Sequence, residues 1–459
     1  MFSTKSTSFT IESPNAVPEP GSGVPRRAAF MGDRPLTGLP ENVNSGWDFF
    51  TRTCDSYPEY EYLGYRPIVD GVAQAYVWET YAQVRDRVDK IAGALVHKGY
   101  GKETAIGIYS TNCPEWLVTA LACYRQDFVP VPLYDSLGTE AVEYIISQSE
   151  MTLAFVAESK LSLLLQHAAK FPLLKTIVVY GTPNADDLGA AAALDVELVS
   201  FTDLEALGAE HPSDPSPATH DSIAVICYTS GTTGKPKGAM ITHRNIISCT
   251  HSASVSLDAG TFPKIAAGDT HLSYLPLAHS FEMYIQFIVL EHGGRVGFSQ
   301  GNPRKIIEDM QELKPSCFIS VPRLLNRVYD EVWSGVRSKG GITKAVFQAA
   351  YASKVQWLKA GRIKSMILDA AIFAKMRALL GGHARFILTG SAPLAPEVIK
   401  FFRVCFSVDV IEGYGQTECA AATTLTWTGD YDSGHVGAPL SCNEIKLLDV
   451  PAMSYTSAD

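Results

Sequence analysis

The sequence predicts an α/β protein with two similar lobes, each a mostly parallel sheet covered by helices, and an incomplete β-barrel lobe at the C-terminus. Short continuous apolar runs alternate with longer amphipathic segments along most of the chain, which is typical of buried parallel strands joined by crossover helices. A Ser-, Pro- and Gly-rich stretch precedes this alternation, and the last residues contain Gly, Pro and alternating apolar and polar residues instead. At 459 residues, the chain is long enough for roughly two or three lobes.

The first lobe is expected over residues 46–220, after a disordered or loosely packed tail over residues 1–45. Thr80 and Gln83 form a capping-box pattern, and the apolar residues that follow recur at helical spacing, so a helix is expected there. Four short apolar runs predict buried strands: TAIGIYS, FVPVPLY, TLAFVA and LKTIVVYG.

Two further details of this lobe are predicted. Asn112 is a candidate cap for the helix that has Pro114 in its first turn, where proline loses no hydrogen bond. Residues 182–220 are rich in Ala, Asp and Pro, and we interpret them as surface excursions before the next core strand.

The second lobe is expected over residues 221–436. Helices are expected at 304–314 and within 323–380, and six apolar runs predict strands: SIAVICY, HLSYLPL, GGRVGFS, CFISV, ARFILTG and VDVIEGY. Residues 437–459 include the alternating run EIKLLDV, which indicates an antiparallel strand. Because a lone strand is not stable, this segment is interpreted as the start of a truncated β lobe.

The composition excludes several classes of protein. The net charge is −10, from 38 basic and 48 acidic residues, which argues against a dedicated nucleic-acid binder. The nine cysteines occur singly, so free buried thiols are favoured over a zinc site or a disulfide framework. No apolar run reaches the length of a transmembrane helix, and the start of the chain has no secretory signal pattern.

The segment YTSGTTGKPKG, from Tyr228 to Gly238, combines glycines, hydroxyl side chains and lysines. Backbone N–H groups and hydroxyls in such a loop can converge on one anion, which predicts phosphate binding. The spacing differs from that of the common phosphate loop. Pro236 disfavours a helix after the loop, so GAMITH is expected to be a strand, with Thr242 capping the next helix. The alternative is a glycine-rich surface hairpin.

Five motifs together resemble the AMP-forming acyl-CoA synthetases of the adenylate-forming superfamily. They are YTSGTTGKPKG, YLPLAHSFE, FISVPRLLNRVYD, ILTGSAPL and EGYGQTE, and they occur in the order of that family. The resemblance covers the chain from about residue 47 onward. The forms YGQTEC and SYLPLAHSFE look most like the long-chain fatty-acid branch.

The resemblance implies a reaction in two steps, with ATP and Mg²⁺ as cofactors. A long-chain fatty carboxylate attacks the α-phosphate of ATP, and the thiol of coenzyme A then displaces AMP from the acyl-adenylate. Such catalysis depends on charge neutralisation and positioning. The resemblance also implies an intracellular enzyme, either cytosolic or peripheral on the endoplasmic reticulum or peroxisome membrane. No nucleic-acid partner is expected.

Roles for individual residues follow from the same resemblance. The residues expected to hold the outer phosphates are Thr229, Ser230, Gly231, Thr232, Thr233, Gly234 and Lys235. Thr417 is expected to contact the α-phosphate, and Glu418 is the expected Mg²⁺ ligand. The residues expected around adenine are Gly390, Ser391, Ala392, Glu412, Gly413, Tyr414 and Gly415. The expected catalytic residues are Lys235, His279, Thr417 and Glu418.

Structural roles remain open for three of these sites. Tyr414 could be a core aromatic residue, although Gly413 and Gly415 on either side of it favour an exposed position. His279 is expected near the acyl carboxylate, but an isolated histidine is more often structural. The segment 320–322 is expected to line an acyl tunnel and is equally well explained as core.

The family's ribose-binding aspartate and its small C-terminal domain, with a catalytic lysine, are not found before Asp459. We therefore expect this chain to bind ATP weakly and to have severely reduced adenylation. The alternatives are a non-catalytic fragment that binds nucleotide or acyl groups, a superfamily ligase for an aryl or medium-chain acid, and a luciferase-like oxidase.

Overall fold

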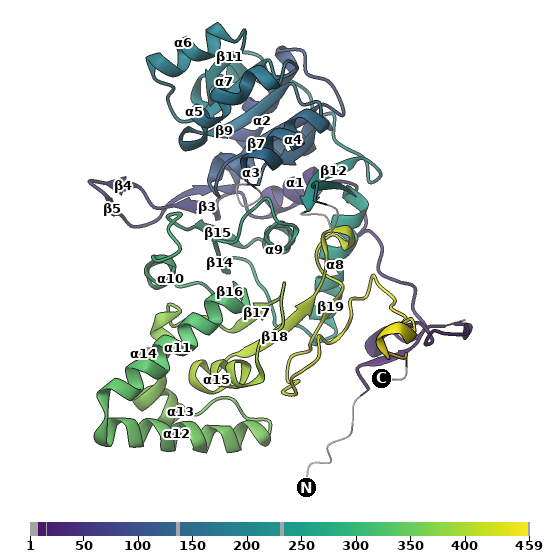
Figure 1. Ribbon diagram of the computed structural model, residues 1–459, viewed down its shortest axis with the longest axis vertical. Coiled ribbons are helices and arrows are strands. Elements are labelled where there is room, and N and C mark those ends of the chain that lie inside the picture. The colour runs from purple at the N-terminus through teal and green to yellow at the C-terminus, as the bar shows by residue number, and fades with distance from the viewer. Residues whose placement is uncertain (1–7, 15, 135–137, 230–233, 458–459) are drawn as a thin grey trace. The chain divides into compact units, whose positions relative to one another are not determined.

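The structure is a computed structural model that describes residues 8–14, 16–134, 138–229 and 234–457 (Figure 1). The chain divides into two units. Unit 1 comprises residues 1–38, 248–265 and 313–459, and unit 2 comprises residues 39–247 and 266–312. The lobe boundaries expected from the sequence stay a prediction.

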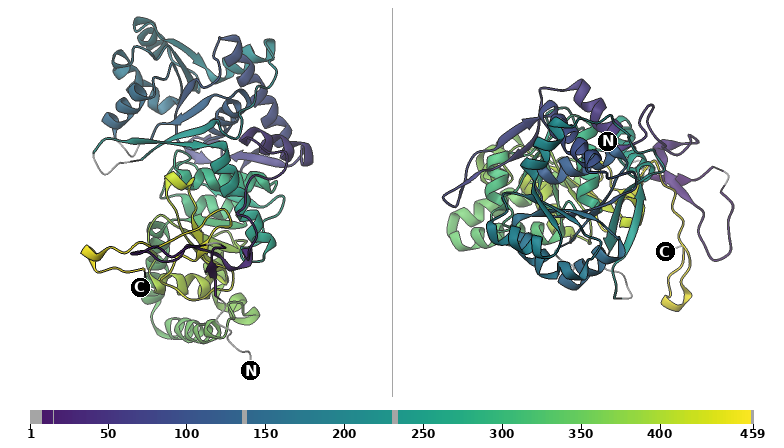
Figure 2. Two further views of the ribbon diagram at one scale, coloured as in Figure 1. Left: turned by 90° about the vertical axis from the view of Figure 1, so that its right-hand side faces the viewer. Right: turned by 90° about the horizontal axis from the view of Figure 1, so that it is seen from above.

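The main sheet of unit 2 has five parallel strands in the order β11-β10-β9-β7-β8. The strands lie where the apolar runs predict them: β7 (Ala105–Tyr109), β8 (Val129–Pro132), β9 (Leu153–Ala157), β10 (Thr176–Tyr180) and β11 (Glu197–Ser200). Figure 2 shows helices on both sides of these blue-to-teal strands. Both faces of the sheet are therefore buried, which explains why the runs are continuously apolar.

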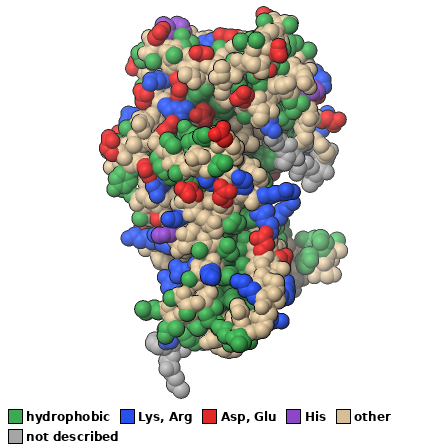
Figure 3. Space-filling model, turned by 90° about the vertical axis from the view of Figure 1, so that its left-hand side faces the viewer, with side chains coloured by type: hydrophobic (Ala, Val, Ile, Leu, Met, Phe, Trp, Pro, Cys, Tyr) green, Lys and Arg blue, Asp and Glu red, His purple; other side chains and the backbone are tan. Residues whose placement is uncertain are grey.

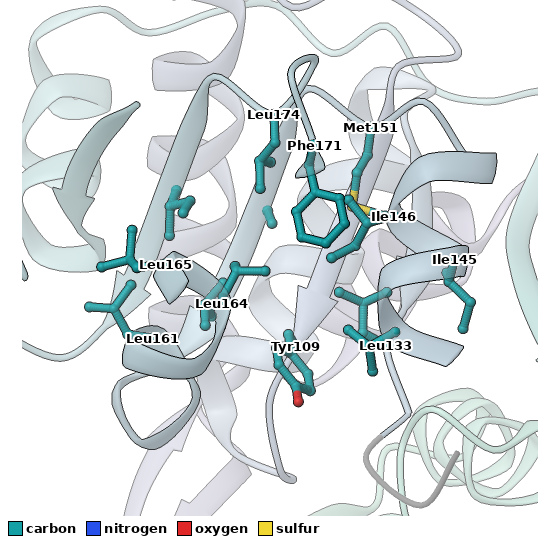
Figure 4. Packing of buried hydrophobic residues seen from close by; sticks show 14 of the residues in the cluster. Tyr109, Leu133, Ile145, Ile146, Met151, Leu161, Leu164, Leu165, Phe171 and Leu174 are labelled. Atoms are coloured by element: carbon teal, nitrogen blue, oxygen red, sulfur yellow. The ribbon is translucent and has the colours of Figure 1, made fainter. Parts of the chain in front are cut away.

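Alternate strand residues pack against different helices. Tyr109, Ala154 and Val179 belong to a buried cluster with the helices α4 (Thr139–Gln148), α5 (Glu158–His167) and α6 (Ala185–Ala193) (Figure 4). On the opposite face, the rings of Phe155 and Tyr180 contact Phe201 of α7 (Phe201–Glu210), with centroids 6.1 and 5.3 Å apart. The period of two in a strand sends these side chains to opposite layers.

Helix α2 (Tyr81–His97) begins at the predicted capping box. The Gln83 amide donates to Thr80 Oγ1 over 3.2 Å, and the Thr80 amide donates to Gln83 Oε1 over 2.8 Å. Helix α2 packs against α7, and the closest approach is at Gly208, where an added Cβ would lie 1.7 Å from the carbonyl oxygen of Lys90. Glycine is required there because the two helix backbones nearly touch.

The interpretation of residues 182–220 as surface excursions was wrong for most of that segment. It contains α6, the edge strand β11 and α7. The side chains of Phe201 and Leu204 are buried. Strand β11 has exposed and half-buried residues because it lies at the sheet edge, so its sequence lacks the continuous apolar run of the inner strands.

Unit 2 also contains a mixed four-stranded sheet and two hairpins. The mixed sheet has the order β14-β15-β3-β6: β14 (Thr270–Ser273), β15 (Arg295–Phe298), β3 (Glu61–Tyr65) and β6 (Val77–Thr80). The hairpins are β4 (Ile68–Val69) with β5 (Val72–Ala73), and β12 (Ile223–Thr229) with β13 (Lys237–Thr242). The other α-helices of unit 2 are α1 (Gly46–Ser56), α3 (Pro114–Gln126) and α9 (Ser280–Glu291). Two further helices, α8 (His243–Asp258) and α10 (Ile306–Leu313), have residues in both units.

The sheet of unit 1 has the order β16-β17-β18-β19-β20, parallel from β16 to β18 and antiparallel beyond. Its strands are β16 (Cys317–Ser320), β17 (Phe386–Thr389), β18 (Asp409–Tyr414), β19 (Thr424–Leu425) and β20 (Ala438–Pro439). Its helices are α11 (Pro322–Lys339), α12 (Gly341–Lys359), α13 (Met366–Leu368), a π-helix (Asp369–Phe373), α14 (Ala374–Leu379) and α15 (Pro396–Phe406). The predicted α/β class with mostly parallel sheets is confirmed.

The two ends of the chain differ from the expectation. Within residues 8–45, β1 (Thr10–Glu12) pairs with β2 (Arg26–Ala28), and the side chains of Ala28 and Met31 are buried. Arg27 forms an ion pair with Glu444. The run EIKLLDV makes isolated bridges to residues 22 and 26 rather than a regular strand, and no closed barrel forms in the part of the chain that the structure describes.

The cysteines and the helices agree with two further expectations from the sequence. None of the nine cysteines, all of which the structure describes, forms a disulfide. Over the described ranges, none of the helices combines the length and the apolar character that a membrane span requires.

We expect Gly208→Ala to lower the free energy of unfolding by about 3 kcal/mol, because the new methyl group forces α2 and α7 apart. Gly189→Ala is the matched control. Gly189 lies in α6, where an added Cβ meets nothing within 4 Å, so this change should stabilise the protein by about 0.5 kcal/mol through helix propensity. Urea unfolding measures both values, and equal effects of the two changes would contradict the close contact.

A pH dependence of stability is expected from His243. Its Nδ1 accepts the Gly46 amide over 3.1 Å, and burial lowers its pKa to about 3. The unfolded chain takes up a proton below about pH 6.5, whereas the folded chain does not until about pH 3. Stability is therefore full above pH 6.5 and decreases as the pH falls, by about 2 kcal/mol at pH 5.

The control for this prediction is His243→Asn, whose side-chain oxygen can accept the same amide but does not titrate. We expect urea unfolding between pH 7 and pH 5 to show a smaller loss for His243→Asn than for the original chain. The same loss in both proteins would refute the assignment to His243.

Candidate active site

Three of the predicted segments meet at one edge of the unit 1 sheet. The register pairs Ser320 of β16 with Thr389 of β17, and Thr389 with Glu412 of β18. Because the three strands are parallel, the segments that follow them leave the sheet at the same carboxyl edge. The structure thus brings 320–322, 390–392 and 412–415 together, at the kind of edge where α/β proteins bind ligands.

Glycine is needed at this edge because backbones pass close to one another. An added Cβ at Gly390 would lie 3.2 Å from the carbonyl oxygen of Gly413, and one at Gly413 would lie 2.7 Å from Leu425 Cδ2. At Gly415 the added atom would lie 1.5 Å from the carbonyl oxygen of Ala421. The glycines expected around adenine therefore fix the path of the chain whatever their role in binding.

Tyr414 is the last residue of β18, and 50% of its surface is exposed. Its carbonyl oxygen accepts the amide of Thr423 over 2.9 Å, which anchors the backbone while leaving the ring in solvent. The alternative of a core aromatic residue is therefore wrong. Ser391, at a backbone φ of 71°, and Ala392 are exposed as well.

Thr417 and Glu418 lie in a short 3₁₀-helix, η5 (Thr417–Cys419), directly after this turn. The amides of Cys419 and Ala421 both donate to the carbonyl oxygen of Gln416 and close the turn. Glu418 is exposed and forms no ion pair in the described ranges. Its carboxylate is available to a ligand.

A half-buried carboxylate and a buried guanidinium support this edge from behind. Burial raises the pKa of Glu412, although its carboxylate accepts a backbone hydrogen bond from Leu394. Arg403 of α15 donates to the carbonyl oxygens of Val410 over 3.1 Å and Asp430 over 2.9 Å. It thereby ties the loop after β19 to β18.

The hairpin of β12 and β13 carries the predicted phosphate loop in unit 2. Tyr228 pairs with Gly238 and Thr229 pairs with Lys237, so GAMITH is a strand, as Pro236 predicts. Thr242 caps the helix after it, because its Oγ1 accepts the amide of Asn245 over 3.3 Å. Gly234 and Lys235 are exposed, and Ser230, Gly231, Thr232 and Thr233 lie outside the described residues.

A cavity of about 370 Å³ opens in unit 2 at the carboxyl ends of two pairs of parallel strands, one pair from each of two sheets. Ser110 follows β7, Tyr134 follows β8, Tyr274 follows β14 and Ser299 follows β15. Leu133, Pro276 and Ile306 add apolar walls. The cavity is therefore amphipathic, as small-molecule sites commonly are.

Asn112 lines this cavity, and its predicted role as a helix cap was wrong. The cap position of α3 is Cys113, without a side-chain hydrogen bond. Asn112 Nδ2 instead donates to Ser273 Oγ over 2.9 Å and to the Leu275 carbonyl over 2.6 Å, and its Oδ1 accepts the Leu277 amide over 2.9 Å. Asn112 thus holds the YLPLAHSFE segment beside β7.

Sequence reasoning missed the cavity residues Asn112, Tyr134, Tyr274 and Ser299. Each lies one to three residues after the end of an observed strand, but Tyr134, Tyr274 and Ser299 fall inside the apolar runs that predict strands. A buried polar chain continues from them, in which Gln286 Nε2 donates to Glu282 Oε1 over 2.8 Å and Glu282 Oε1 lies 2.9 Å from His271 Nε2.

His279 caps α9, because its Nδ1 accepts the amide of Phe281 over 3.1 Å. Its ring centroid lies 6.4 Å from that of Tyr134. Burial lowers the pKa of His279, and the positive end of the helix dipole also disfavours a cation there. An accepting Nδ1 places the proton of the neutral ring on Nε2. His279 is therefore a neutral donor as well as a helix cap.

Substitutions separate these two roles. We expect His279→Ala to lower the free energy of unfolding by about 1 kcal/mol, because the cap is lost. His279→Asn should lie within about 0.5 kcal/mol of the original chain, because Asn is a good cap. Urea unfolding at pH 7 tests this, and equal losses in both variants would show that the cap is not what His279 contributes.

The chain resembles known proteins over most of its length. The family model described as AMP-binding enzyme matches residues 50–458. The peroxisomal long chain acyl-CoA synthetase 7 of Arabidopsis thaliana is 40% identical over 412 residues, 90% of this chain and 58% of that protein. Long-chain-fatty-acid–CoA ligase 5 of Rattus norvegicus is 40% identical over 403 residues, 86% of this chain and 58% of that protein.

The chain thus spans 58% of the length of these curated relatives. A solved structure, the adenylation domain of a carboxylate reductase from Mycobacterium chelonae, matches with a TM-score of 0.70 at 19% identity, over 86% of this chain and 63% of that one. This similarity shows the fold. The match of the family model to residues 50–458 shows that the chain belongs to the family of AMP-binding enzymes.

Proposed function

We propose that this chain carries the acid-activating site of a long-chain fatty-acid–CoA ligase. A fatty carboxylate oxygen bonds to the α-phosphorus of ATP and pyrophosphate leaves; the thiol of coenzyme A then attacks the acyl carbon and AMP leaves. The observation that carries the proposal is the convergence of 390–392 and 412–418 at one sheet edge. It occurs in a chain 40% identical to relatives that bear this name.

The carboxyl edge of the unit 1 sheet suits adenine and the α-phosphate. Tyr414 offers an exposed aromatic face, and Gly390, Ser391, Ala392, Gly413 and Gly415 let the base approach the backbone. Glu412 lies half-buried beside them. Thr417 offers a hydroxyl donor to an α-phosphate oxygen, where negative charge grows as the carboxylate attacks.

Glu418 suits a Mg²⁺ ion that arrives with ATP. In the residues that the structure describes, no group of three or more His, Cys, Asp or Glu side chains could hold a metal ion. An exposed, unpaired carboxylate is nevertheless the usual protein ligand of Mg²⁺, whose other ligands are phosphate oxygens and water. Bound there, the ion would neutralise the charge of the phosphates.

The β12–β13 hairpin suits the β and γ phosphates. Its two strands are tied by antiparallel pairing up to Thr229 and Lys237, next to the segment that the sequence predicts to bind phosphate. Lys235 lies over the ring of Tyr144 of α4, with Nζ 5.5 Å from the centroid. Such an exposed cation–π contact is worth only about 1 kcal/mol, and a phosphate ligand can therefore draw Lys235 away from it.

The unit 2 cavity suits the acyl group. Apolar walls at Leu133 and Ile306 and donors at Ser110 and Asn112 match a chain that ends in a carboxylate. His279 follows Ala278 of the lining, and its neutral Nε2–H can donate to a carboxylate oxygen. Within the family, the relatives' names favour a long-chain acid over an aryl or medium-chain one.

The location in the cell is also proposed from the relatives. One of them is named as peroxisomal. A long-chain acid partitions into lipid, so we propose an intracellular enzyme that contacts a membrane at its periphery.

Nucleotide binding tests the adenine site. We expect Tyr414→Ala to weaken Mg²⁺·ATP binding to the 459-residue chain about tenfold, because the aromatic platform is lost. The matched control is Tyr455→Ala, since Tyr455 is similarly exposed in the same unit. Isothermal titration calorimetry measures both affinities. Unchanged binding in Tyr414→Ala would refute the site.

Pyrophosphate exchange into ATP tests the chemistry. A long-chain acid should drive more exchange than a medium-chain or an aryl acid, and Glu418→Gln should reduce it about 100-fold. Glu397→Gln, an exposed carboxylate on α15, is the control. ATP binding without acid-dependent exchange would contradict an activating site.

A further inference from the structure

The segment of unit 1 from the end of α11 to α14 has an unusual charge. Residues 337–377 contain nine Lys or Arg and one Asp, a net charge of +8, in a chain whose net charge is −10. The single Asp369 is buried and paired with Lys354, with 2.6 Å between Nζ and Oδ1. The other eight basic residues form no ion pair in the described part of the chain. Within residues 337–377, the charges that solvent can reach are therefore all positive.

Large apolar side chains are exposed in the same segment. Residues 357–367, which we name the basic loop, connect α12 to α13. Met366 is 92% exposed, Ile367 79% and Trp357 39%. Lys359, Arg362 and Lys364 lie between Trp357 and Met366 and are exposed. Eleven consecutive residues cannot spread far, so the two kinds of side chain lie together.

The fold holds the basic loop in this conformation. At its start, Leu358 is buried and the amide of Arg362 donates to the Trp357 carbonyl over 2.9 Å. At its end, the amide of Ser365 donates to Asp369 Oδ2 over 2.8 Å. Lys354 holds Asp369 and also donates to Ser407 Oγ over 2.7 Å. The buried ion pair thus anchors the loop with Met366 and Ile367 in solvent.

The same combination continues along α12. Ile342 is 83% exposed, Val346 is also exposed, and Lys344 lies between them. Figure 3 shows basic and apolar side chains meeting at its lower end, over α12–α14. An apolar surface of this kind without a partner is costly in water.

We propose that the basic loop and α12 dock on an anionic phospholipid bilayer. Basic side chains are attracted to acidic headgroups, and apolar side chains beside them enter the boundary between headgroups and acyl chains. Met and Ile side chains favour lipid over a nucleic acid, whose phosphates would leave them exposed. The docking rests on this surface alone, while its use, to take fatty acids from the bilayer, rests on the proposed function.

Co-sedimentation of the 459-residue chain with vesicles tests the docking. We expect binding to vesicles of phosphatidylcholine and phosphatidylserine, little binding to phosphatidylcholine alone, and weaker binding in higher salt. The triple change Lys359→Gln, Arg362→Gln and Lys364→Gln should lower partitioning about 100-fold. The double change Met366→Ser and Ile367→Ser should lower it at least about tenfold.

Matched controls lie in unit 2. Ile68→Ser with Val69→Ser removes an equally apolar exposed pair from the β4–β5 hairpin, and Lys102→Gln, Lys170→Gln and Lys175→Gln remove three exposed lysines. Both controls should bind as the original chain does. No binding of the original chain to anionic vesicles, or equal losses in the controls, would overturn the proposal. Mg²⁺·ATP binding, measured in parallel, reports on the proposed function separately.

Discussion

Parallel pairing is the constraint on which the rest of this structure depends. Strands that run in the same direction end at the same edge of a sheet, and their connections must return under covering helices. In the unit 1 sheet this brings Ser320, Thr389 and Glu412 into register, although residues 321–385 of the sequence lie between the first two strands. In unit 2 it places Ser110 and Tyr134 at one cavity. Polar residues that can bind ligands lie at these edges because the side chains of the strands themselves are buried in the core.

The interior behind these edges keeps its polar groups neutral or paired. His243 is buried beside Gly46 and remains uncharged. The guanidinium of Arg403 instead donates hydrogen bonds to backbone carbonyl oxygens. The ammonium group of Lys354 forms an ion pair with Asp369. Each of these choices limits the cost of burying a charge, which is several kcal/mol when a charged group lacks a partner.

Much of the fold could be predicted from local pattern. The capping box at Thr80 and the break imposed by Pro236 each depend on a few neighbouring residues. Strand β11 was missed because it lies at the sheet edge, where its side chains are less buried and fewer of them need to be apolar. The role of Asn112 was missed because its partners, Ser273 and Leu275, are distant in sequence. The structure brings the motif segments 320–322, 390–392 and 412–415 to one sheet edge, whereas the cavity residues could be identified only once the order of the strands was known.

The contact between Gly415 and Ala421 has a consequence for evolution. Because the chain doubles back with no space for a side chain, the tyrosine before this glycine and the acidic residue after it are parts of one rigid loop. In the proposed site, a substitution that shifts Tyr414 against the base would therefore also shift Glu418, the proposed Mg²⁺ ligand. Changes in nucleotide preference would therefore require paired substitutions at this turn, and neutral drift would be slow there even though its side chains face solvent.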